Sequence, residues 1–200
     1  GSAEAAVGAI YSESSTIGYC NFTNNTVKNT RYGGGAVYLK SGEIAYCDFT
    51  KNTADIGNGG AILMSSVTVM YCNFTDNVAT NGNGGAISSS TGNIQYCNFL
   101  NNTALLQSGG AIYTSSKGAV GDCNFTNNSA AFGGAIRFTD TSTVENCNFI
   151  NNTAIGRINS NVGGGAIHFN NGGTVSGSNF INNSKLNAGS NTGGGAIFFR

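Results

Sequence analysis

Apolar and polar residues alternate along this chain in short runs that return at a regular interval. In the stretch 84–102, Ile87, Ile94 and Phe99 stand at positions that predict an inward direction, whereas Ser88 and Asn98 are expected to face outward. Runs this short, bounded by Gly, Asn, Asp and Ser, predict about three strands per repeat, joined by turns. No window keeps helical periodicity for ten residues.

The repeat itself reads Gly-Gly-Ala-Ile, then Cys-Asn-Phe, then an Asn three residues after the Phe. Its Phe falls at Phe22, Phe49, Phe74, Phe99, Phe125, Phe149 and Phe180, and its closing Asn at Asn25, Asn52, Asn77, Asn102, Asn128, Asn152 and Asn183. A period in the twenties indicates a solenoid, in which each strand pairs in parallel with its equivalent one coil away. We therefore predict an all-β, right-handed parallel β-helix of about seven to eight coils.

In such a fold each repeated position becomes a row along the helix axis. The Phe row predicts an aromatic stack, and the closing Asn row predicts a structural corner in which amides bond one another or a turn backbone. The aliphatic row consists of Ile10, Val37, Ile62, Ile87, Ile112, Ile136, Ile167 and Ile197. These rows predict the core, and the ligand-binding alternative for the Asn row is the weaker reading.

The spacing from Ala to Cys is eleven or twelve residues throughout, whereas the connection from the closing Asn to the next Gly-Ala pair varies widely in length. The long ones run from Asn25 to Gly34, from Asn152 to Gly164 and from Asn183 to Gly194. Repeat proteins commonly bind through the face that carries their insertions. Surface corners also tolerate length changes without any function, so both interpretations stay open here.

Charge and composition exclude several partners. Nine basic and nine acidic residues give zero formal net charge, which argues against nucleic acid and against anionic lipid. No stretch approaches the ~20 apolar residues of a membrane span, so no direct membrane insertion is expected. We expect residues 1–200 to form a single β-helix domain, a piece of a longer array, with residues 1–2 resembling a cloning remnant.

The pairing of Gly-Gly-Ala-(Ile/Val) with Phe-x-x-Asn resembles the repeats of the chlamydial polymorphic outer-membrane proteins, which are autotransporter adhesins. The form Cys-Asn-Phe-x-Asn-Asn-Thr-Ala is also similar to the adhesin-like surface proteins of methanogenic archaea. The resemblance covers essentially the whole chain, apart from a worn first repeat and Ser178 in place of Cys. It implies a secreted, extracellular protein of the cell surface that attaches to a protein or glycan of a host or neighbouring cell.

The cysteines occupy one repeated position: Cys20, Cys47, Cys72, Cys97, Cys123 and Cys147. Parallel Cβ atoms about 4.8 Å apart lie beyond the ~3.8 Å that a disulfide prefers, so a buried row of free thiols is expected. A straight row also lacks the tetrahedral convergence that zinc needs. We predict no metal and no cofactor.

Two alternatives to adhesion are a polysaccharide-active enzyme and an ice-binding protein. A polysaccharide-active lyase or hydrolase would need two carboxyl groups across a cleft, and Asp122 with Glu145 is the nearest such approach. His168, the only His, is expected on the outward surface without a catalytic role. An ice-binding β-solenoid would need a flat Thr array. The two Thr-rich rows, which begin at Thr23 and at Thr26, are expected to lie on opposite sides of a corner and not on one flat strand. We therefore expect a protein that is not an enzyme.

Eight Asn-x-Ser/Thr sequons suit a glycosylated surface, although the repeat produces them as a by-product: Asn21, Asn24, Asn73, Asn101, Asn124, Asn127, Asn151 and Asn182.

Tyrosines supply the candidate binding residues. Tyr19, Tyr46, Tyr71 and Tyr96 precede the Cys in the first four repeats, where later repeats carry Asp122, Asn146 and Gly177. Asp, Asn and Gly at one position indicate a left-handed turn, so these Tyr side chains should point to solvent at coil spacing. A second outward row, after the aliphatic position, carries Tyr11, Tyr38 and Tyr113. Tyr suits contact with sugars or proteins, although stacked rings that merely shield the turn would also explain the first row.

Overall fold

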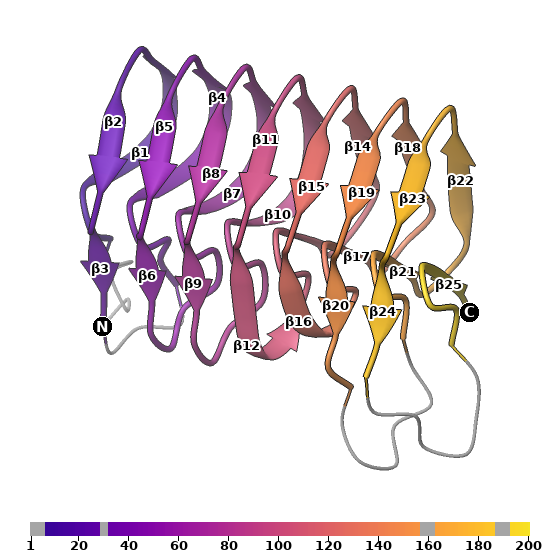
Figure 1. Ribbon diagram of the computed structural model, residues 1–200. Helices are drawn as coiled ribbons and strands as arrows, with labels where there is room; N and C mark the ends of the chain where they lie inside the picture. Colours follow the sequence, from indigo (N-terminus) through magenta and orange to yellow (C-terminus); the bar gives the residue numbers. More distant parts are fainter. Residues whose placement is uncertain (1–6, 29–31, 157–162, 187–192) are drawn as a thin grey trace.

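Strands alone build the described part of the molecule. The computed structural model describes residues 7–28, 32–156, 163–186 and 193–200, and these residues form twenty-five strands in three parallel sheets. The chain visits the three sheets in turn and advances along one axis with each coil (Figure 1). The predicted right-handed parallel β-helix is therefore confirmed. No helix in the described ranges is long and apolar enough to cross a membrane.

Sheet A is the longest face of the coil. Four of its strands have nine residues, and the later coils each divide this face into two shorter strands. The nine-residue strands are β1 (Ile10–Gly18), β4 (Val37–Ala45), β7 (Ile62–Met70) and β10 (Ile87–Gln95). The shorter strands are β13 (Ile112–Thr114), β14 (Gly118–Gly121), β17 (Ile136–Phe138), β18 (Ser142–Glu145), β21 (Ile167–Phe169), β22 (Gly173–Ser176) and β25 (Ile197–Phe199).

Sheets B and C each stack seven short strands. Sheet B holds the Asn-Phe segments: β2 (Asn21–Thr23), β5 (Asp48–Thr50), β8 (Asn73–Thr75), β11 (Asn98–Leu100), β15 (Asn124–Thr126), β19 (Asn148–Ile150) and β23 (Asn179–Ile181). Sheet C follows the closing Asn: β3 (Thr26–Val27), β6 (Thr53–Ala54), β9 (Val78–Ala79), β12 (Thr103–Ser108), β16 (Ser129–Phe132), β20 (Thr153–Ala154) and β24 (Ser184–Lys185).

The repeated inward residues form the core, as predicted. Successive Phe rings of the stack lie 4.7–4.9 Å apart between centroids, and Phe99 is only 1% exposed. At the corner between sheets B and C, the Nδ2 of Asn77 donates to the Oδ1 of Asn102 (2.9 Å) and to the carbonyl of Phe49 (2.9 Å). The closing Asn row is therefore structural, because these buried amides satisfy turn backbone and each other.

One extra residue separates two kinds of coil. Ala86 and Cys97 are eleven residues apart, whereas Ala111 and Cys123 are twelve apart. Strands β10 and β13 match up to Ser89 and Thr114, and then the register resumes at Gly92 and Gly118, one residue later on the second coil. An unpaired extra residue interrupts a ladder, so sheet A divides there. The predicted number of about three strands per repeat is therefore correct for the first four coils, whereas the later coils contain four.

The prediction that His168 lies on the outer surface is wrong. Its side chain is 0% exposed and packs edge-on against the rings of Phe198 (centroids 5.0 Å apart) and Phe132 (6.5 Å). The end of β16 supplies Phe132, so a neighbouring segment covers this part of the outward row of sheet A. Ser88, in the same row, was also expected to face solvent and is buried instead.

Candidate functional site

The first Tyr row forms a regular stack on the outside of the corner between sheets A and B. Neighbouring rings lie 4.9–5.0 Å apart between centroids and within 5–7° of parallel, from Tyr19 through Tyr46 and Tyr71 to Tyr96. Tyr19 is 82% exposed and the other three are 44–48% exposed. The structure therefore brings together all four residues at the spacing that the sequence predicted.

The backbone at these tyrosines has the left-handed conformation. Their φ angles are 53–55°, and Asp122, Asn146 and Gly177 at the same position of later coils have φ of 52–56°. A left-handed residue with a Cβ costs roughly 1–2 kcal/mol, which Gly avoids and which Asn and Asp reduce through local hydrogen bonds. Stacking a pair of rings stabilises the fold by about 0.5–1.5 kcal/mol. Stability alone thus gives little net reason to place Tyr at this turn.

The second Tyr row is not continuous. Tyr11 and Tyr38 stack with centroids 5.2 Å apart and an interplanar angle of 29°. Leu63 and Ser88 occupy the next two coils before Tyr113, so Tyr113 lies apart from the pair. The hydroxyl of Tyr11 donates to the Glu13 carboxylate, and this bond raises the pKa of Tyr11.

Beside the first Tyr row runs an exposed amide row that the sequence analysis did not single out. It lies one position after the Cys of each coil, or after Ser178 in the last one. Asn98 Nδ2 donates to Asn73 Oδ1 (2.9 Å), and Asn73 Nδ2 donates to Asp48 Oδ1 (2.8 Å). The same bonds continue through later coils, from Asn124, Asn148 and Asn179. The signal was present in the sequence, since Asn recurs here at an outward position.

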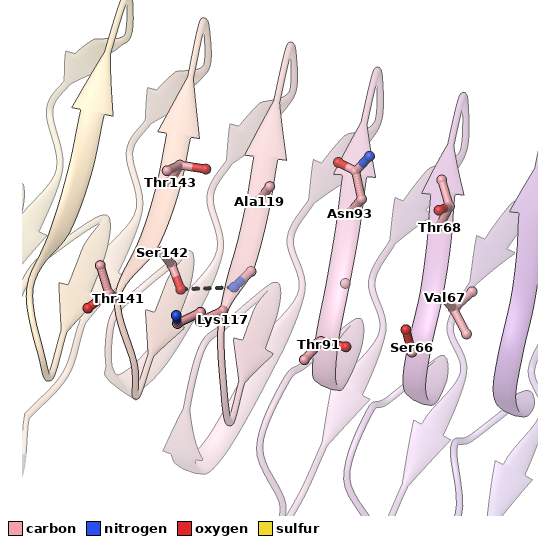
Figure 2. Close-up of a pocket in the computed structure, with 12 residues that line it drawn as sticks. Ser66, Val67, Thr68, Thr91, Asn93, Lys117, Ala119, Thr141, Ser142 and Thr143 are labelled. Carbon is pink, nitrogen blue, oxygen red and sulfur yellow. Dashed lines mark hydrogen bonds between the residues drawn. The ribbon is translucent and has the colours of Figure 1, made fainter.

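A shallow groove of about 500 Å³ lies on the outer face of sheet A (Figure 2). It crosses the junction between the nine-residue strands β7 and β10 and the divided coils of β14 and β18. Two rows of outward side chains border it: Ser66, Thr91, Lys117 and Thr141 on one side, and Thr68, Asn93, Ala119 and Thr143 on the other. Gly118 N–H donates to Ser142 Oγ (3.0 Å) within its floor. The sequence did not predict this groove because its lining comes from four neighbouring coils.

Comparison with known proteins supports the same architecture. A family model described as a right handed beta helix region matches residues 5–154. The chain belongs to this right-handed β-helix family. No curated protein and no solved structure matches the chain.

This β-helix fold occurs in both enzymes and non-enzymes. The positions of Asp122 and Glu145 therefore bear on the enzyme alternative, because glycoside hydrolysis requires two carboxyl groups. Asp122 and Glu145 are neighbours in successive coils, because the Asp122 N–H donates to the Glu145 carbonyl (3.0 Å). Both side chains are exposed, and neither lines the groove on sheet A.

The thiols of this β-helix are all free. Burial raises the pKa of the Cys97 thiol, which keeps it protonated and packed as a small apolar group. In the described ranges, no three His, Cys, Asp or Glu residues gather as a possible metal site.

Two other sequence predictions concern the connections and the Thr rows. Parts of the long connections, residues 29–31, 157–162 and 187–192, lie outside the described residues, so their role stays a prediction. The Thr-rich rows belong to different sheets, with Thr23 in β2 and Thr26 in β3, and the left-handed residue Asn24 (φ 56°) lies between them. They do not form one flat array.

Proposed function

We propose that this β-helix is a non-catalytic adhesive segment of an extracellular cell-surface protein, and that the first Tyr row is its attachment surface. The row consists of Tyr19, Tyr46, Tyr71 and Tyr96. The observation that supports this most strongly is the placement of four bulky, exposed rings at left-handed positions. Backbone strain of this kind persists where the surrounding structure holds it, and it concentrates at functional sites.

The stack also has the physical qualities of a binding surface. Each Tyr offers apolar contact area, a polar tip and only two rotatable bonds. Stacking fixes the rings before a partner arrives, so little side-chain entropy is lost on binding. A rigid rod would hold this surface away from the cell that carries it.

The polysaccharide-active enzyme remains the second candidate, because the sheet A groove carries hydroxyl and amide side chains on a β-helix surface. Glycoside hydrolysis requires a carboxylic acid and a carboxylate on the two sides of the bond. The described residues that line the groove supply hydroxyls, one amide and the Lys117 ammonium, without a carboxylate. This composition favours binding over catalysis. Release of reducing sugar from a polysaccharide panel would support the enzyme instead.

The test replaces Tyr46, Tyr71 and Tyr96 together by Asn, the residue that Asn146 shows this turn accepts. Cell or glycan binding should weaken at least tenfold, because three anchor side chains of the surface are removed. The circular dichroism spectrum should be unchanged.

A matched control is Tyr38→Ser in the second row, where Ser88 occupies the equivalent position. It should leave binding unchanged. If the triple variant binds as well as its parent, the first Tyr row is structural. The long connections before Gly164 and Gly194 would then be the better candidates.

A further inference from the structure

The inner rings of the first Tyr row present their edges rather than their faces to a partner. Tyr46 and Tyr71 each have a parallel ring on both sides, at 4.9 and 5.0 Å. Their faces are therefore covered, and a sugar ring cannot stack flat on them. What remains accessible is a line of phenol hydroxyls and positively polarised ring edges, both of which suit oxygen-rich partners.

The exposed amide row repeats at the same interval beside it. In each of these coils one Cys, such as the buried Cys97, separates the Tyr from the Asn or Asp. An Asn side chain has two N–H groups and two lone pairs. Asn73 uses one N–H to donate to Asp48, and one lone pair of its carbonyl oxygen accepts from Asn98. One donor and one acceptor of each Asn amide in these coils are thus left for a partner, whereas the Asp48 carboxylate only accepts.

Over the first four coils the Tyr row keeps one residue type, and the amide row reads Asn21, Asp48, Asn73 and Asn98. Packing explains why inward Phe and Ile recur, but an exposed hydrogen bond contributes only about 0.5–1.5 kcal/mol. The outward row beside the sheet A groove shows the contrast, since it reads Thr16, Glu43, Thr68, Asn93, Ala119, Thr143 and Thr174. A surface that repeats at each coil fits a partner that repeats at the same interval.

We propose that the first Tyr row and the amide row of Asp48, Asn73 and Asn98 together form a linear site for a neutral polysaccharide. The sugar chain lies along the helix axis with about one sugar unit per coil. An extended sugar unit is about as long as the strand spacing of ~4.8 Å. Asp48 is the only charged residue in the two rows over these coils, so a neutral chain fits better than an acidic one. This inference rests on the proposed function, since it names the ligand of the same surface.

The closing experiment starts from an array of linear neutral oligosaccharides of two to about eight units, followed by calorimetry on the series that binds. Each added sugar should strengthen binding by roughly three- to tenfold, since each one gains a coil of hydrogen bonds. The gain should end near four to five units, because the Tyr stack spans four coils.

Two variants test the rows separately. Asn73→Ala with Asn98→Ala should weaken binding of a five-unit chain by about tenfold or more. Its control, Asn148→Ala with Asn179→Ala, removes two ladder bonds of the same kind in coils without Tyr and should leave binding unchanged. A third variant, Asp122→Tyr with Asn146→Tyr, extends the Tyr stack by two coils. The length of sugar chain at which affinity stops rising should then increase by about two units.

Several results would overturn this inference. They are affinity that does not depend on chain length, an equal loss in the control pair, or no neutral oligosaccharide bound at all. If the triple Tyr variant loses cell binding while no neutral chain binds, attachment through the Tyr row stands, with a protein or charged glycan as its partner. If the triple Tyr variant keeps cell binding, both the attachment surface and its ligand assignment fail.

Discussion

The first four coils and the later three share their Phe stack and Asn ladder but differ in sheet A and at the left-handed turn. Both contain the same Phe stack and the same buried Asn ladder. The first four have nine-residue strands in sheet A and Tyr at the left-handed turn, whereas the later ones have divided strands and Asp, Asn or Gly there. The groove of Figure 2 lies where the two kinds of coil meet. The repeated inward residues thus determine the β-helix itself. The outward residues can differ between coils and determine what the surface contacts.

The largest expected effect tests whether the two regions have one common core. Phe99→Ala in the first region and Phe149→Ala in the second should each cost about 3–5 kcal/mol, because each removes a buried ring with neighbours on both sides. Chemical denaturation measures both. A melting temperature within a degree or two of the parent would show that the Phe row is not the core, and a large effect in only one region would show that the cores differ.

The next prediction separates the regions by pH. Burial, together with the charges of Arg137 and Arg200, lowers the pKa of His168 from 6.5 to about 3. Between these two values the folded chain binds fewer protons than the unfolded one, so stability must fall as pH falls. The loss is at most about 1.4 kcal/mol per pH unit in this window. Hydrogen exchange at pH 7 and pH 4.5 should show β17 and β21 opening more easily in acid.

His168→Phe is the control, because Phe198 already occupies the next coil of that row. This variant should lose the acid sensitivity of β17 and β21 while keeping any effect that arises from carboxylates elsewhere. An unchanged pH profile in the variant would mean that His168 does not carry the effect.

Sequence reasoning found the rows that packing enforces and missed what tertiary contacts add. Phe99 and Asn102 were predicted because a fixed period leaves one way to bury them. His168 was misplaced because the covering ring, Phe132, lies 36 positions earlier in the sequence. The Tyr turn was predicted from Asp122 and Gly177 at the same position. The twelve-residue spacing that divides sheet A was visible, but its effect on strand register depends on neighbouring coils.

A smaller effect tests why Tyr occurs in only one region. Tyr96→Asn should change stability by less than about 1 kcal/mol, since relief of the left-handed strain offsets the lost stacking. Asn146→Tyr should destabilise by about 1–2 kcal/mol, because Asp122 and Gly177 on either side offer no ring to stack on. Denaturation midpoints measure both. A strongly destabilised Tyr96→Asn variant would indicate that the Tyr row exists for stability.

The smallest expected effect concerns Lys51, which differs in residue type from the equivalent position of every other coil. The left-handed turn after sheet B carries Asn or Asp in six coils, at Asn24, Asp76, Asn101, Asn127, Asn151 and Asn182, and Lys51 in the remaining one, with φ of 55°. Lys lacks the short polar side chain that supports this conformation. Lys51→Asn should therefore stabilise the chain by about 0.5–1 kcal/mol.

Lys51 also stands one coil from Asp76, and opposite charges at a protein surface attract one another weakly. High salt screens that attraction, so the gain from Lys51→Asn should be larger in 1 M salt than in dilute buffer. The reverse change, Asn101→Lys, should destabilise by a similar amount, because its turn has the same φ of 56°. If both variants match the parent at high salt, the left-handed turn does not select its residue. The strain argument for the Tyr row, which rests on the same backbone conformation, would weaken with it.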